Sequence, residues 1–109
     1  MALLKGTLDV AVLKTLSWSP MHAVEVSTWL EERSAGRLVV EDAALMQALH
    51  RLEARRLLAA EWGVTDNGRR ARYYRLTPAG RAHLKDETAK LTEYFDALTA
   101  ILRARSQNG

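Results

Sequence analysis

A cluster of arginines near the middle of the 109-residue chain has the chemistry and spacing to bind phosphate. Arg69, Arg70, Arg72 and Arg75 follow the run 66–68, Asp-Asn-Gly, a turn signal because Asn and Gly tolerate positive φ. Guanidinium groups match phosphate with two parallel hydrogen bonds and also suit a narrow minor groove. Strand alternation puts Arg70 and Arg72 on one face and Arg75 on the other. The pattern predicts a basic hairpin whose tip contacts phosphate; a solvated tip with charges for solubility is the alternative.

The stretch before this hairpin predicts a helix whose outward side chains read DNA. The helix is expected to begin near Asp42, a residue type that caps the first turn. Its apolar residues recur at spacings of four and three and form one inner stripe, Leu45, Leu49 and Leu52. On the outer side, Gln47 can read adenine, Arg51 can read guanine or hold phosphate, and Ala44 can touch a thymine methyl. His50 is a further candidate for DNA contact.

Other roles stay open for two of these residues. Arg51 is also placed to form an ion pair with Glu53 or with another neighbour. His50 could cap, pack or contact phosphate instead of reading a base. The sequence therefore names candidate DNA contacts without assigning each one a partner.

The surrounding segments supply the elements that would hold this helix and hairpin in place. Turn residues and apolar spacing predict two earlier helices, the first capped by Thr7, and they predict two hairpin strands. A β-prone segment before the third helix could add a third strand. The expected ranges are helices 7–18, 22–34 and 42–55, hairpin strands 59–65 and 69–76, and the β-prone segment 37–41. A helix followed by a basic-tipped hairpin is the outline of a winged helix-turn-helix, a mainly α fold with a small β-hairpin.

One long C-terminal helix follows the hairpin. Thr77 caps it and Pro78 takes its first position, where proline loses no hydrogen bond. A helix over 78–104 would be ~40 Å long, too long for three short helices and a hairpin to cover. Its apolar seam is therefore expected to pack on a second copy of the chain through Leu84, Leu91, Phe95, Leu98 and Leu102. The chain divides into a DNA-binding domain, 1–76, a dimerisation helix, 77–105, and a disordered tail, 106–109.

Composition limits the functional classes. The net charge is only +3, and the chain has three histidines and no cysteine, which excludes disulfides and thiolate chemistry. The histidines lie far apart without metal-ligand spacing, and no nucleophile elbow or phosphate-binding glycine motif occurs. We therefore expect neither an enzyme nor a metal or cofactor site. No apolar run approaches the ~20 residues of a membrane span, and no signal-peptide pattern opens the sequence, so a cytoplasmic location is expected.

Two tryptophans are candidates for a small-molecule site. Trp18 ends the first predicted helix and Trp29 lies in the second. Aromatic side chains often line sites for flat molecules, although packing in the core or at an interface is the alternative. The range 78–104 contains no tryptophan, so a ligand stacked between tryptophans of the last helix is not expected.

Taken in order, several motifs resemble the PadR family of bacterial transcriptional regulators, in particular its short-tailed members. The motifs are LLKGTLDVAVLKTLS, PMHA, ALHRLE and AEWGVTDNGRRARYYRLTPAGR, and the resemblance spans residues 3–104. It implies a homodimeric winged-helix repressor that leaves its operator when a small molecule binds. It further implies that residues 42–55 form the recognition helix, 59–76 the wing and 78–104 the dimer helix.

The sequence departs from the family pattern where the recognition helix begins. The family usually has a hydroxyl residue and a tyrosine there, whereas this chain has Ala43, Ala44, Leu45, Met46 and Gln47. The leading prediction is a dimeric DNA-binding regulator, with double-stranded DNA, a second copy and a small-molecule effector as partners. The alternative is a protein-interaction or ligand-sensing dimer of the same fold with weakened DNA binding.

Overall fold

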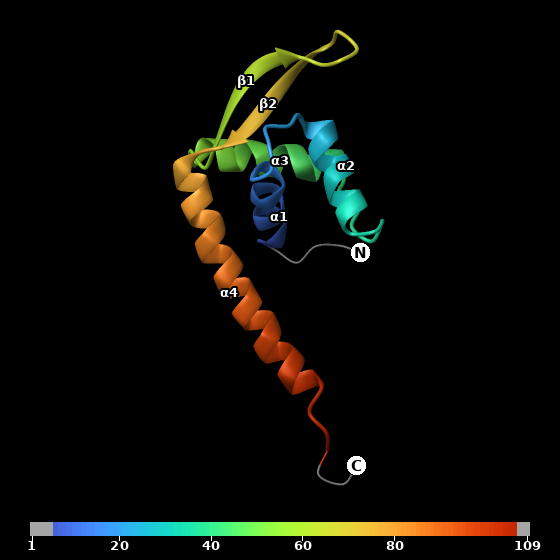
Figure 1. Cartoon of the computed structure of the whole chain (residues 1–109), viewed down its shortest axis with the longest axis vertical. Coiled ribbons are helices and arrows are strands. Elements are labelled where there is room, and N and C mark those ends of the chain that lie inside the picture. Colours follow the sequence, from blue (N-terminus) through green and yellow to red (C-terminus); the bar gives the residue numbers. More distant parts are fainter. Residues whose placement is uncertain (1–5, 107–109) are drawn as a thin grey trace.

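The computed structural model describes residues 6–106, which form a helical body, a projecting hairpin and one long helix (Figure 1). The elements are α1 Thr7–Leu16, α2 Ala23–Arg33, α3 Asp42–Ala54, β1 Leu58–Val64, β2 Arg70–Leu76 and α4 Pro78–Leu102. This confirms the predicted mainly α class with a small β-hairpin and a long C-terminal helix. The predicted tail falls mostly on residues 107–109, which lie outside the described residues.

The core gathers around α1, which packs against α2, α3 and α4. The apolar stripe predicted for α3 is buried, with Leu45, Leu49 and Leu52 at 2% exposure or less. Tyr74 of β2 closes the core from the side of the hairpin and is 1% exposed. α3 is therefore held by its inner stripe, and its opposite side is left for other contacts.

Two helix caps differ from those expected. Thr7 is the first residue of α1, and Gly6 takes the cap position in the left-handed region at φ 87°. Asp42 is likewise the first residue of α3, with Glu41 ahead of it and no side-chain cap hydrogen bond. α2 has the more complete start, because His22 Nδ1 accepts the backbone N–H of Glu25 while the Glu25 carboxylate accepts that of His22.

The hairpin is antiparallel, and its register runs from Leu58 opposite Leu76 to Val64 opposite Arg70. A further bridge forms on the free edge of β2, where Met21 and Tyr74 exchange two backbone hydrogen bonds of 3.1 and 2.9 Å. The expectation that residues 37–41 form the third strand is wrong. Met21, two residues before α2, lies beside β2 instead, and the β-prone segment has no strand structure.

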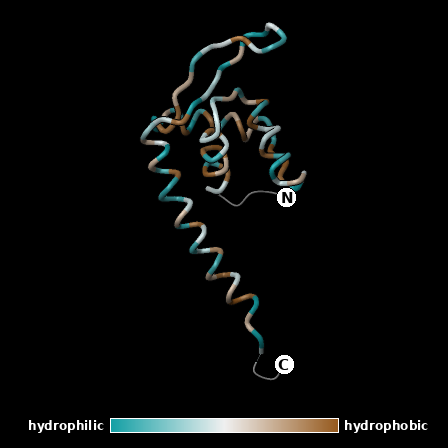
Figure 2. The backbone as a smooth tube through the Cα atoms, in the orientation of Figure 1, coloured by the Kyte–Doolittle hydropathy of each residue, from teal (hydrophilic) through white to brown (hydrophobic). Residues whose placement is uncertain are grey.

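α4 begins in the body and then leaves it. Leu84 is part of the core, but Phe95, Leu98, Ile101 and Leu102 are between 37% and 75% exposed. Figure 2 shows apolar positions recurring along the projecting part of this helix. α4 gives the molecule its elongated shape of 64 × 29 × 21 Å. None of the helices between residues 6 and 106 is both long and apolar enough to cross a membrane.

The first turn of α4 is fixed against the end of α3. Thr77 Oγ1 accepts the N–H of Gly80 and donates toward the carbonyls of Arg56 and Leu57. The Thr77 N–H also donates to the Leu57 carbonyl, at 3.1 Å. A Cβ at Gly80 would lie 2.0 Å from that carbonyl oxygen, so only glycine allows the two segments to approach this closely.

Gly80→Ala is expected to lower the free energy of unfolding by about 3 kcal/mol, because the added methyl group forces α4 away from Leu57. Chemical denaturation followed by circular dichroism measures the change. Ala79→Ser, at the exposed neighbouring position, serves as the control and should alter stability by less than about 0.5 kcal/mol. A G80A protein as stable as its parent would contradict this close packing.

Candidate nucleic-acid interface

The face of α3 opposite the core carries most of the predicted DNA-reading residues. Gln47, His50 and Arg51 are exposed, whereas Ala44 is half-buried. Met46 is also half-buried and packs against the core. The helix thus offers one polar side to solvent, and the Gln47 amide makes no hydrogen bond to another side chain between residues 6 and 106.

Arg51 forms an ion pair, but with Asp9 of α1 and not with Glu53. Its Nη2 atom lies 2.6 Å from Asp9 Oδ1, and the guanidinium side chain is 52% exposed. The hydrogen bond to Asp9 and the charge of that carboxylate raise the pKa of Arg51 above its usual value. Arg51 therefore connects α3 to α1. DNA contact by this residue remains a prediction, and the DNA would compete with Asp9 for its guanidinium group.

Arg72 is tied in a similar way. Its Nη2 atom lies 2.6 Å from Glu53 Oε2, which connects β2 to the last turn of α3. The same guanidinium lies over the ring of Tyr74, 5.8 Å from the ring centroid. Burial raises the pKa of the Tyr74 phenol, Arg72 lowers it, and Glu53 raises it by a smaller amount. The ion pair therefore holds the middle of the hairpin in position relative to α3.

The tip of the hairpin carries arginines of a different kind. Arg69 and Arg70 are exposed, and neither pairs with a carboxylate in the described part of the chain. The Arg70 guanidinium lies over the Trp62 ring, 4.7 Å from its centroid. Arg75, on the opposite face as predicted, stands across from Ala59 near the base. Arg69 and Arg70 thus place two positive charges without a carboxylate partner at the tip of the hairpin.

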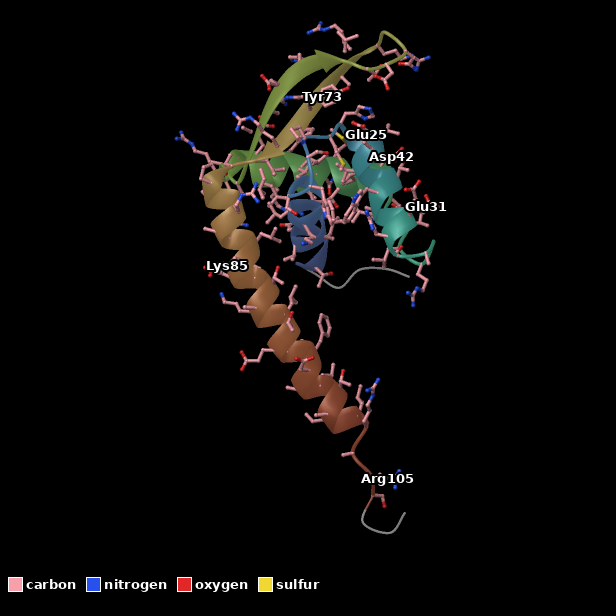
Figure 3. All side chains as sticks on the ribbon, viewed as in Figure 1. Glu25, Glu31, Asp42, Tyr73, Lys85 and Arg105 are labelled. Atoms are coloured by element: carbon pink, nitrogen blue, oxygen red, sulfur yellow. The ribbon has the colours of Figure 1, made fainter. Side chains whose placement is uncertain are left out.

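A groove of about 550 Å³ separates this tip from the start of α2. It is lined by His22, Val24, Thr65, Asp66, Asn67, Arg69, Arg70 and Ala71. Figure 3 marks Tyr73 on the hairpin and Glu25 at the start of α2, the two elements that border it. The His22 and Tyr73 rings form an edge-to-face contact, with their centroids 5.4 Å apart. Sequence reasoning did not place His22 here, because the bridge that brings Met21 to β2 has no local signal.

Trp18 and Trp29 do come together on the body of the molecule. Their ring centroids are 6.2 Å apart, and the planes are inclined at 48°. The Arg33 guanidinium lies 5.3 and 5.2 Å from the two centroids, within the range of a cation–π contact with both rings. The pair therefore forms an aromatic surface that is already covered by the chain's own cation.

The residues predicted for the dimer interface divide into two groups. Leu84 is 8% exposed in the core of its own chain, which leaves little of it for a partner. Leu91 and Phe95 line a groove of about 610 Å³ between α1 and α4, while Leu98 and Leu102 lie beyond it on the projecting helix. The rest of the groove is lined by Val10, Ala11, Lys14, Ser17, Arg81, Leu84, Lys85, Thr88 and Thr92.

No group of three histidine or acidic side chains gathers closely enough to hold a metal ion between residues 6 and 106. The fold and the surface just described, with a helix exposed on one side and a hairpin basic at its tip, define a winged-helix protein of the kind that regulates transcription.

Comparison with known proteins assigns the family. The transcriptional regulator PadR-like family matches residues 12–86. The transcriptional regulator Rv3488 of Mycobacterium tuberculosis is 47% identical over 66 residues, which cover 60% of this chain and 61% of that protein. The chain belongs to the PadR-like family of transcriptional regulators, a family of regulators and not of enzymes.

Solved structures agree with this assignment. A PadR-like transcription factor from Bacteroides fragilis is 30% identical, with a TM-score of 0.74 over 89% of this chain and 91% of that one. A transcriptional regulator from Clostridium thermocellum is 21% identical and shares the fold, with a TM-score of 0.82 over 91% of this chain and 96% of that one. The predicted family and the winged-helix fold are therefore confirmed.

Glu53→Gln is expected to loosen the hairpin, because Arg72 loses its charged partner at the end of α3. Both side chains are partly exposed, so the loss in unfolding free energy should not exceed about 1 kcal/mol. Hydrogen exchange at the β2 amides measures the loosening directly and should become faster. Glu61→Gln, on the other face of the hairpin, is the control; equal exchange rates in the E53Q protein and its parent would contradict a positioning role for this ion pair.

Proposed function

We propose that the chain is a homodimeric DNA-binding repressor that leaves a palindromic promoter operator when a small-molecule effector binds. The observation that carries the DNA-binding part is the position of Arg69 and Arg70, exposed at the hairpin tip without a carboxylate partner in the described chain. The outer face of α3, with Gln47, would enter the major groove, and the tip would lie on phosphates beside it.

A second copy of the chain is the proposed occupant of the uncovered half of α4. Support comes from exposed apolar side chains along that half and from the apolar groove between α1 and α4 that continues it. Two copies related by a two-fold axis would present two α3 helices to successive major grooves, ~34 Å apart. A palindromic operator follows from that symmetry.

The Trp18–Trp29 pair is the proposed contact for the effector. Its rings already hold a planar cation, the guanidinium of Arg33, so a flat aromatic molecule could take the same faces. α2, which carries Trp29 and Arg33, also contacts β2 and α3. A ligand that moved this helix would therefore disturb the DNA-binding surface.

Arg69→Ala with Arg70→Ala is expected to weaken binding to duplex DNA of any sequence, by roughly tenfold for each arginine. Each lost phosphate contact should also lower the slope of log affinity against log salt by about one. Mobility shifts with the upstream region of the chain's own gene, repeated at several salt concentrations, measure both quantities.

Arg75→Ala, on the other face of the same strand, is the matched control and should leave the salt slope nearly unchanged. Equal losses for the control and for the R69A/R70A protein would contradict a specific role for the tip. Absence of any shift by the parent protein at low salt would instead favour the protein-interaction alternative.

Phe95→Glu and Leu98→Glu are each expected to convert the dimer to a monomer, because they place charge in the apolar seam of α4. Sedimentation equilibrium measures the mass directly. Ala100→Glu adds the same charge on the opposite side of the helix and should remain dimeric. A parent protein that sediments as a monomer at micromolar concentration would rule out the proposed assembly.

A further inference from the structure

One face of the hairpin continues the apolar core out to the tip. Alternate residues of β1 share this face, namely Leu58, Ala60, Trp62 and Val64. Leu58 is buried, but Trp62 and Val64 are 63% and 66% exposed. Trp62 and Val64 therefore form an exposed pair of apolar side chains near the tip of the hairpin.

Charge on the same face favours a polyanion as the covering molecule. Arg72 stands opposite Trp62, and Arg70 stands opposite Val64, with the Arg70 guanidinium stacked on the indole ring. The reverse face carries the exposed Glu61 and Arg75, whose opposite charges offset each other. The face that combines the apolar pair with the arginines is therefore the one suited to a phosphate-bearing partner.

The position of this face also fits DNA. Arg72 on the same face reaches Glu53 in the last turn of α3, so the face is turned toward the proposed reading helix. It continues outward to Arg70, the residue that begins β2 at the tip. A DNA strand that followed α3 and the tip would pass across Trp62.

We propose that Trp62 and Val64 pack against the deoxyribose rings of one DNA strand while Arg70, held by the indole ring, binds an adjacent phosphate. The inference rests on the proposed function, since it requires duplex DNA at this surface. Along a DNA strand, sugar rings with apolar faces alternate with phosphates. An indole ring beside a guanidinium group therefore matches one sugar and the phosphate next to it. The contact is independent of base sequence.

Two different signatures follow for two neighbouring residues. Trp62→Ala should lower affinity for duplex DNA about tenfold and leave the salt slope unchanged, because an apolar contact releases no counterions. Arg70→Ala should lower affinity and reduce the slope by about one. Trp62→Phe keeps an aromatic ring and should retain most of the affinity.

The experiment uses the full chain and a random-sequence duplex of ~30 base pairs at low salt, because the proposed contact ignores sequence. Fluorescence anisotropy of the labelled duplex gives the affinity and the salt slope for the parent, W62A, W62F and R70A proteins. Trp18→Phe with Trp29→Phe leaves Trp62 as the single tryptophan. Acrylamide quenching of its fluorescence should fall when the protein is saturated with the duplex.

Loss of affinity in W62A with an unchanged slope, together with protection of Trp62 by DNA, supports the inference. Unchanged affinity in W62A, or equal quenching with and without duplex, overturns it even if the R69A/R70A protein binds poorly. If the parent protein does not bind the duplex at low salt, the proposed function itself is wrong. This result differs from both outcomes for W62A, which require a parent protein that binds DNA.

Discussion

The Leu57 carbonyl is the point on which the arrangement of α3, the hairpin and α4 depends. It follows the end of α3 and precedes β1, and it receives hydrogen bonds from both the N–H and the hydroxyl of Thr77, which joins β2 to α4. Gly80 packs directly against it. This junction, together with the packing of α4 on α1, holds the long helix in its direction relative to the proposed reading helix. In a dimer held together by α4, the spacing between two reading helices would be set by this junction.

Four arginines of α3 and the hairpin divide into two groups by what surrounds them. Arg51 and Arg72 each pair with a carboxylate of the same chain, and these pairs join α3 to α1 and to the hairpin. Arg69 and Arg70 have no such carboxylate partner in the described chain, and they lie where the hairpin projects farthest from the body (Figure 1). Arg51 and Arg72 thus stabilise the relative position of the elements, while Arg69 and Arg70 are left for a partner. The sequence of the hairpin is rich in arginine, but only part of this positive charge is therefore available to DNA.

Local signals account for what the sequence predicted well. Pro78 after Thr77 marks the start of α4, and the turn at Gly68 marks the hairpin, because both depend on backbone preferences of a few neighbouring residues. Contacts between distant segments were not predictable in the same way. Asp9 is 42 positions from Arg51, and Met21 lies beside β2 only after α2 has folded against it. The burial of Leu84 was missed for the same reason, since a heptad pattern does not tell which part of a helix packs on its own chain.

The central claim is that two identical chains present paired reading helices and basic hairpins to duplex DNA. The most direct test is to incubate the purified protein with fragmented genomic DNA and sequence the fragments that it retains. The account predicts enrichment of an inverted repeat whose half-site centres are ~10 base pairs, or a multiple of this, apart. Retention of no DNA, or of a single unrepeated motif, would contradict it.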